Sequence, residues 1–206
     1  MRTVGCALAL SLIFLNPANA DPPLRSTAAQ VIADASAADV FEVVPDTEHT
    51  AVRHTRSGLV CRLDPGNSNR IVFYPDAARG EDVGCESRSG AGETIKFIAT
   101  RYTVEATLDA QVLITEDLIR RQFPDAQALP AATQTIGGVR TRTVQFMITR
   151  AGVPVYTRAS MAVVGQWSYA LRYTAGATDA AATARAERVS AALWNAMLND
   201  LTARRS

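Results

Sequence analysis

Residues 139–174 read VRTRTVQFMITRAGVPVYTRASMAVVGQWSYALRYT, and this stretch decides the fold. Apolar and polar residues alternate along three runs, at 139–149, 153–164 and 167–174, which is typical of β-strands with one face better buried than the other. Glycine-containing turns at 150–152 and 165–166 join the runs, and such short turns favour pairing between strands that are neighbours in sequence. The pattern predicts an antiparallel three-stranded meander.

A helix is predicted directly after the meander, at about residues 179–202. Its apolar residues recur every four positions and therefore form one stripe; they are Val189, Leu193, Met197 and Leu201. We expect this stripe to cover one face of the meander, because the helix follows an uncovered sheet in the chain. Contact with a partner protein is the alternative.

Residues 94–123 predict a strand followed by another helix. The strand, Thr94–Tyr102, is apolar on both sides in its middle, as expected for a central position in a sheet. Thr107 is placed to cap a helix at 108–123. The residues expected to be buried on this helix share one stripe: Leu108, Val112, Ile119 and Phe123.

The chain before residue 94 is predicted to be rich in turns and short strands. Ser26 can cap a helix that ends at about Ala38, and strands follow at 41–44, 58–63 and 70–74. Turns are expected at 64–67 and 79–82, and a Ser/Gly loop at 87–93. The predicted fold class is α+β: a small β-rich part at 21–93, and an antiparallel meander flanked by helices at 94–206, together forming one compact unit.

The composition argues against binding to nucleic acid. Of 206 residues, 48% are hydrophobic and 20% charged, which is enough apolar material for a buried core. The net charge is +1, and Arg2 is the only charged residue among the first twenty, so the remainder carries 20 basic and 20 acidic residues. A chain balanced in this way has no overall field that attracts DNA, RNA or acidic lipid.

The first twenty residues have the three parts of an export signal. Arg2 supplies the positive start, Val4–Leu15 the apolar run and Ala18–Ala20 the cleavage site. The run is shorter than the ~20 residues needed to span a bilayer, and no later segment is apolar enough to do so. We expect a mature chain that begins at Asp21, is exported and has no membrane span. The periplasm is the expected compartment and the cell exterior the alternative; an uncleaved anchor is the other interpretation.

Two cysteines, Cys61 and Cys85, remain once Cys6 leaves with the signal. In an oxidising compartment such a pair predicts a disulfide. A metal site at these cysteines would need further ligands, and His49 and His54 lack zinc-like spacing to either of them. We therefore expect a disulfide and neither a metal nor a cofactor.

The order of elements from Thr94 to Leu201 is strand, helix, glycine-punctuated meander, helix. GVPVY at 152–156 opens one strand and GQWSYAL at 165–171 starts the next. This arrangement resembles the PsbP-like α/β/α sandwich, in which helices flank an antiparallel sheet. The resemblance covers roughly residues 94–202 and leaves the Cys61–Cys85 region outside. It implies a fold used mostly for binding and assembly, with no common active site to carry over.

His54 is the most interesting titratable residue. No nucleophile elbow, zinc-binding helix or phosphate-binding loop is present in the sequence. His54 lies between Arg53 and Arg56, whose charges disfavour its protonated form, so it could act as a neutral base. A surface or strand histidine in a hairpin is the simpler interpretation. Similarly, the acidic residues Glu81, Asp82 and Glu86 are either calcium ligands or solvated side chains.

Arginines and aromatic residues of the meander are candidate contacts for a ligand or partner. Arg140, Arg142, Arg158 and Arg172 lie on neighbouring strands and would form a basic patch for an anionic group or acidic partner if their registers align. Solvated cross-strand charge is the simpler alternative. The aromatic residues are expected in the core, with a ligand groove as the alternative: Tyr156, Trp167, Tyr169 and Tyr173.

Two functional hypotheses follow. The favoured one is an exported, non-enzymatic binding or assembly domain for an unknown protein or small ligand, and a purely structural envelope component is a variant of it. The alternative is an envelope hydrolase or thiol-dependent enzyme that uses His54.

Overall fold

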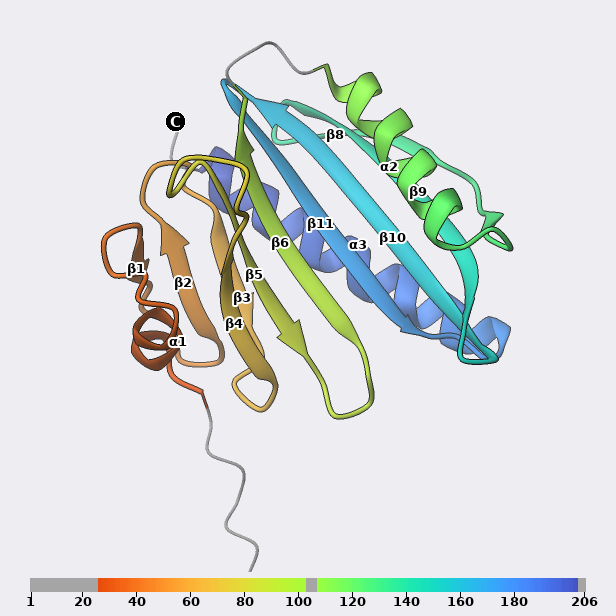
Figure 1. Ribbon diagram of the computed structural model, residues 1–206, viewed down its shortest axis with the longest axis horizontal. Coiled ribbons are helices and arrows are strands. Elements are labelled where there is room, and N and C mark those ends of the chain that lie inside the picture. Colours follow the sequence, from red (N-terminus) through yellow and green to blue (C-terminus); the bar gives the residue numbers. More distant parts are fainter. Residues whose placement is uncertain (1–25, 103–106, 204–206) are drawn as a thin grey trace, which may run out of the picture.

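The meander expected at residues 139–174 is present as three antiparallel strands, β9 (Val139–Arg150), β10 (Val153–Val164) and β11 (Trp167–Gly176) (Figure 1). Between β9 and β10, Ala151 and Gly152 have φ values of 49° and 79°. Positive φ at both positions gives a two-residue turn the twist that paired strands need. The prediction of a sequential meander is confirmed.

The structure, a computed structural model, describes residues 26–102 and 107–203. The predicted export signal at 1–20 and the predicted start of the mature chain at Asp21 lie outside the described residues. No helix within the described ranges is long and apolar enough to cross a membrane.

The meander is part of an eight-stranded sheet in the order β4–β5–β6–β11–β10–β9–β7, with β8 also paired to β9. All pairs are antiparallel. β6 pairs with β5 on one side and with β11 on the other, so the strand predicted to be central is central. The remaining strands are β4 (Ser68–Phe73), β5 (Asp82–Arg88), β6 (Thr94–Arg101), β7 (Gln127–Ala128) and β8 (Ala132–Ile136).

The turn expected at 79–82 is present, but strand β5 corrects the expectation of a loop that begins at residue 87. The strand runs from Asp82 to Arg88, and only Ser89–Glu93 turn the chain into β6. The polar residues of β5 do not signal a loop, because Glu86 and Arg88 pair with charges on the sheet surface. The large sheet therefore includes strands from both sides of residue 93.

A second, three-stranded sheet lies beside β4 (Figure 1). It consists of β1 (Phe41–Val43), β2 (Thr50–His54) and β3 (Val60–Leu63), and β2 is a strand that the sequence did not predict. Helix α1 (Ala28–Asp34) precedes it. Thr27 rather than Ser26 caps α1 by accepting from the backbone N–H of Gln30, and the helix ends before Ala38 because the chain turns at Ser36, where φ is 49°.

Helix α3 (Ala180–Thr202) covers one face of the large sheet (Figure 1). Its buried residues are Ala186, Ser190, Trp194, Met197, Leu198 and Leu201. The predicted stripe is thus right for Met197 and Leu201 but wrong for Val189, which is 37% exposed. The helix is rotated so that its largest side chain, Trp194, is fully buried in the main core.

Helix α2 (Leu108–Gln122) lies on the opposite face of the large sheet, over β9 and β10 (Figure 1). As predicted, Thr107 caps it by accepting from the backbone N–H of Ala110. Val112 is buried in a second core cluster with Val144, Phe146 and other residues of β9 and β10, and three further members of the predicted stripe pack against this cluster: Leu108, Ile119 and Phe123.

The predicted disulfide is present between Cys61 and Cys85, with a Cα–Cα distance of 6.3 Å. Cys61 lies on β3 and Cys85 on β5, so the bond joins the three-stranded sheet to the eight-stranded sheet. Both residues belong to the main core.

Replacing both cysteines with alanine is expected to lower the free energy of unfolding by about 3 kcal/mol, because a cross-link over a loop of this length restricts the unfolded chain. Urea titration of the purified protein measures the loss. Reductant should reproduce it in the wild type and have no effect on the double variant. Equal stability of the oxidised wild type, the reduced wild type and the double variant would contradict the expectation.

Candidate functional site

The sheet face that carries α2 is only partly covered by it. α2 packs on β9 and β10, whereas β4, β5, β6 and β11 show this face beside the helix (Figure 1). The other face of these strands packs into the main core, which includes Ile71, Cys85, Phe97 and Leu171. Because successive side chains of a strand point to opposite faces, the residues next to these point to the uncovered side.

Strand register places basic side chains from several strands next to one another on the uncovered face. One row across the sheet contains Arg88, Thr94, Thr174 and Thr157. The next row, two residues further along each strand, contains Arg70, Glu86, Lys96, Arg172 and Ala159. The two rows are about 7 Å apart, as two residues of an extended strand are.

A single buried carboxylate lies at the centre of these basic residues. Glu86 is 3% exposed, and its Oε1 accepts from Arg70 and Arg88 at 3.0 and 3.4 Å. The Nζ of Lys96 lies 2.8 Å from Oε2. Burial alone would raise the pKa of Glu86, but Lys96 and Arg70 outweigh burial, and the pKa lies below its usual value. Glu86 is therefore ionised near neutral pH, where it pairs with Arg70, Arg88 and Lys96.

A cavity of about 260 Å³ lies between these rows and the C-terminal end of α2. Arg88, Lys96, Arg150 and Arg172 contribute charge to its lining, and no carboxylate residue is among the residues that line it. Arg150 and Arg172 form no ion pair within the described part of the chain. The other lining residues supply mainly hydroxyl groups and apolar surface: Thr94, Thr157, Thr174, Ile119, Phe123, Ile148 and Ala159, together with Gln122 and Arg158.

The four arginines expected to share a patch are separated by the register. Arg172 lies at the cavity. Arg140 and Arg142 lie beside Asp109 at the start of α2. Arg158 also borders the cavity, but it is 7% exposed, and its guanidinium donates to Ser160 and Thr143 on the α3 side of the sheet. The cations that accompany Arg172 come instead from β5, β6 and the end of β9.

The meander aromatics lie mainly in the core. Tyr156, Tyr169 and Tyr173 are buried in the main cluster, and Trp167 packs against it. Tyr156 is fully buried and donates to the side chain of Gln145 at 2.7 Å. These residues face α3 and take no part in the cavity beside α2.

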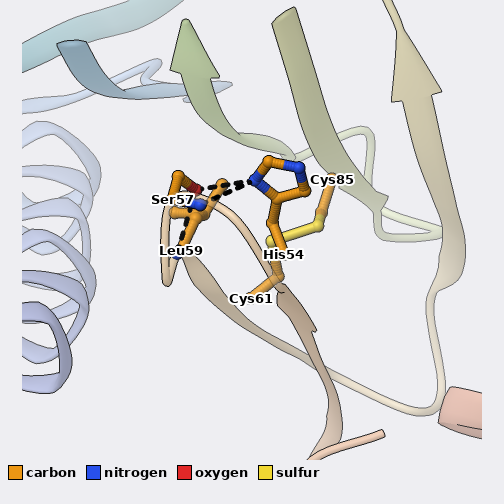
Figure 2. The surroundings of a disulfide bond; sticks show 5 residues. All are labelled: His54, Ser57, Leu59, Cys61 and Cys85. Atoms are coloured by element: carbon orange, nitrogen blue, oxygen red, sulfur yellow. Dashed lines mark hydrogen bonds between the residues drawn. A yellow bond between two sulfur atoms is a disulfide. The ribbon is translucent and has the colours of Figure 1, made fainter. Parts of the chain in front are cut away.

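His54 is fully buried at the end of β2, between the rings of Phe41 and Trp167. Its Nδ1 accepts from the backbone N–H of Ser57 at 3.2 Å and lies 2.8 Å from the Ser57 hydroxyl, which accepts from the N–H of Leu59 (Figure 2). Burial, and then the charge of Arg56, lower the pKa of His54 to about 4. The histidine is neutral near pH 7, and the main cause is burial rather than the neighbouring arginine.

The surroundings of His54 do not support the hydrolase or thiol-dependent hypothesis. With none of its surface exposed, His54 does not contact solvent or a substrate. Gly80 has a φ of 80°, and a Cβ there would lie 3.6 Å from Nε2, so the backbone closes over the ring. The nearby cysteines are joined to each other and offer no thiolate (Figure 2).

The acidic residues once considered for calcium have protein partners. Glu81 accepts from Arg56 and Arg101, and Asp82 accepts from Thr100. Glu86 is held by the cations described above. The described residues contain no group of three His, Cys, Asp or Glu side chains placed to hold a metal ion.

Of the residues that line the cavity beside α2, sequence singled out Arg158 and Arg172 but not Arg88, Lys96 or Arg150, and it considered Glu86 only as a calcium ligand. A signal was available at residues 82–88, where Val83, Cys85 and Ser87 alternate with Asp82, Gly84, Glu86 and Arg88. Reading that alternation as a strand would have placed Glu86 and Arg88 on one face. Their position next to Lys96 and Arg172 depends on pairing between strands far apart in the chain.

No family model matches the chain, and a search of curated proteins found no similar sequence. The solution structure of cyanobacterial PsbP (CyanoP) from Synechocystis sp. PCC 6803 is similar, with a TM-score of 0.51 and 12% identity over 73% of this chain and 92% of that one. The chain has a PsbP-like fold. The similarity extends beyond the predicted stretch at about 94–202, because 73% of 206 residues is about 150, more than the 109 residues of that stretch.

Two other solved structures overlap less closely. LpqN, involved in cell envelope biogenesis of Mycobacterium tuberculosis, gives a TM-score of 0.42 and 18% identity over 80% of this chain and 94% of that one. PA94 from Pseudomonas aeruginosa, a protein of unknown function and putative regulator, gives a TM-score of 0.41 and 14% identity over 72% of this chain and 95% of that one.

The burial of His54 predicts a pH-dependent stability. The unfolded chain takes up a proton at this residue near pH 6.5, whereas the folded chain does so only near pH 4. The contribution of His54 to the free energy of unfolding is therefore complete above pH 6.5. It falls by about 3 kcal/mol as the pH is lowered to 4. Urea unfolding across this range measures the change.

Two histidine variants provide the control. His54→Gln cannot titrate and should lose this part of the pH dependence, while His49→Gln, at an exposed position, should keep it. If His54→Gln fails to fold, NMR titration of the ring in the wild type gives its pKa directly. A ring that titrates near pH 6.5 in the folded protein contradicts the expectation.

Proposed function

We propose that this protein is an exported, non-enzymatic domain that binds a small anion in the cavity beside α2. One observation carries the proposal: the cavity is lined by several cations and by hydroxyl groups, and no carboxylate is among its lining residues. Anions are bound in proteins by charge-assisted hydrogen bonds from arginine and lysine, which are about twice as strong as neutral ones.

The charge balance leaves part of the cluster available to a ligand. Glu86 is shared by Arg70, Arg88 and Lys96, so it neutralises only a fraction of their charge. Arg150 and Arg172 lie at the same cavity without a carboxylate partner among the described residues. Bringing so many cations together is unfavourable unless an anion joins them, and a bound anion would reduce their repulsion.

The size of the cavity suits a small ligand. At ~30 Å³ per water molecule, a volume of 260 Å³ corresponds to about nine waters. That is at the lower end of the usual range for ligand pockets and large enough for a carboxylate or phosphate group with a few further atoms.

The lining supports binding rather than turnover. Thr94, Thr157 and Thr174 offer hydroxyl groups, but the lining contains no His, Cys, Asp or Glu that could activate them. The three threonines and the cations are donors placed for an anion, as in a binding site that fixes orientation by a few polar groups.

Export, with the periplasm as the destination, is part of the proposal. It is supported by the signal-like pattern of residues 1–20 and by the Cys61–Cys85 disulfide, since such bonds persist in oxidising compartments.

Removing the two unpaired arginines is expected to weaken anion binding without harming the fold. In NMR titrations with sodium acetate and with inorganic phosphate, the purified protein should show shifts at β6 and β11 that saturate. Arg150→Gln and Arg172→Gln should each weaken binding about 10- to 150-fold, because a hydrogen bond to a charged group contributes ~1.5–3 kcal/mol.

The matched control is Arg121→Gln, which removes an exposed arginine that pairs with Asp117 on α2. It should bind like the wild type. A second readout uses Lys96, the only lysine of the chain: bound anion should slow acetylation of its amine, followed by mass spectrometry. Equal loss in all three variants, or no saturable shifts, would overturn the proposal.

A further inference from the structure

A second cavity continues the cationic cavity along α2. It has a volume of about 230 Å³, and Ala159 and Arg172 line both cavities. Most of the second lining is apolar: Ile98, Tyr102, Ile114, Leu118, Met161 and Ala170. The two cavities are therefore one groove between α2 and the sheet, cationic at one end and apolar at the other.

The strand register explains the change of chemistry along the groove. The row that follows Lys96, Arg172 and Ala159 consists of Ile98, Ala170 and Met161. The row after that contains Thr100 and Ser168. Since rows are about 7 Å apart, this apolar row lies about 7 Å from the cations, and the surface becomes polar again about 13 Å from them.

Helix α2 forms an apolar wall above this floor. Ile114 and Leu118 are one turn apart and line the groove, yet they are 60% and 49% exposed. Large apolar side chains exposed beside an apolar floor gain from any ligand that removes them from water. Leu113 on the same helix is 66% exposed but does not line the groove.

A buried polar group lies at the far end of the groove. Gln111 is 8% exposed, its Oε1 accepts from Ser168, and its Nε2 has no partner among the described residues. A buried donor without a partner costs free energy, and a hydrocarbon chain offers it no acceptor. Gln111 ends the apolar stretch and limits the length of a bound chain.

We infer that the ligand is a medium-chain fatty acid. Its carboxylate lies at Lys96, Arg150 and Arg172, and its hydrocarbon chain lies over Ile98, Ala170 and Met161 beneath Ile114 and Leu118. This inference rests on the proposed anion-binding function and names the class of its ligand. An extended chain advances roughly 1.2 Å per bond, so 13 Å corresponds to about ten carbons.

A single chain fits this groove better than a bilayer surface does. Met161 is 3% exposed, and it lies on the sheet beneath Thr115 of α2. A flat lipid surface would meet the raised helix before it reached this floor. One acyl chain, by contrast, can enter lengthwise between the helix and β6.

Affinity is expected to rise with chain length at a constant head group. In calorimetric titrations of the purified protein, each methylene from butyrate to decanoate should tighten binding about two- to fourfold, the range between partial and full burial. The gain should stop near ten carbons, where the apolar floor ends. All acids are kept below the concentrations at which they form micelles.

Variants of the floor and of the wall of the groove test the contribution of the acyl chain to affinity separately from that of the head group. Ala170→Leu fills the floor and should return decanoate affinity to that of butyrate; Ala128→Leu, at an exposed position on β7, is its control. Ile114→Ala should weaken decanoate severalfold, and Leu113→Ala should not. Thermal unfolding verifies that each variant is folded.

The outcomes distinguish this inference from the proposed function. If butyrate and decanoate bind equally and both depend on Arg172, the fatty-acid inference is wrong and anion binding stands. If neither acid binds, both are wrong. Binding to phosphatidylglycerol vesicles without binding to monomeric decanoate would also overturn the inference, and so would equal affinity for decanoate and a neutral alkyl glycoside of the same chain length.

Discussion

The pairing of β6 with β11 is the contact on which both faces of the large sheet depend. It places Phe97 opposite Leu171 on the side that packs against α3, and Lys96 opposite Arg172 on the side of α2. A slip of one residue would exchange these faces, burying a cation in the core and exposing Phe97. Because Phe97 and Leu171 are 2% and 0% exposed, the core prevents the slip. The apolar side of the sheet thus determines where the cations of the other side lie.

The parts of the fold that sequence predicts are those set by local pattern. The meander, α2 with its Thr107 cap, α3 and the Cys61–Cys85 pair follow from alternation, helical spacing and cysteine count. Strand β5 was missed because its charged residues are typical of loops when taken alone. In the sheet, Arg70 and Lys96 offset the free-energy cost of burying charge on β5. They come from the strands on either side of it. Likewise, the rotation of α3 about its axis depends on how Trp194 fits the core, which spacing does not specify.

The candidate site also depends on contacts between segments far apart in the chain, which local sequence patterns do not predict. Arg172 was found because it lies in the meander, whereas its neighbours come from strands that contact it only after folding. His54 shows the converse: its polar sequence surroundings suggested an accessible group, and Phe41 and Trp167 bury it. In both cases the environment that controls the chemistry of a side chain is supplied by residues remote in sequence. Titratable residues can be listed from a sequence, but their desolvation and partners require the tertiary structure.

The position of the disulfide has a consequence for the order in which the molecule matures. The bond connects the two sheets rather than two strands of one sheet. Before its thiols are oxidised, the three-stranded sheet is held to the large sheet by packing and by the chain between β3 and β4. The disulfide adds a covalent link between β3 and β5, so the contact between the two sheets gains its full stability only on oxidation. If the chain is exported as proposed, that step follows its arrival in an oxidising compartment.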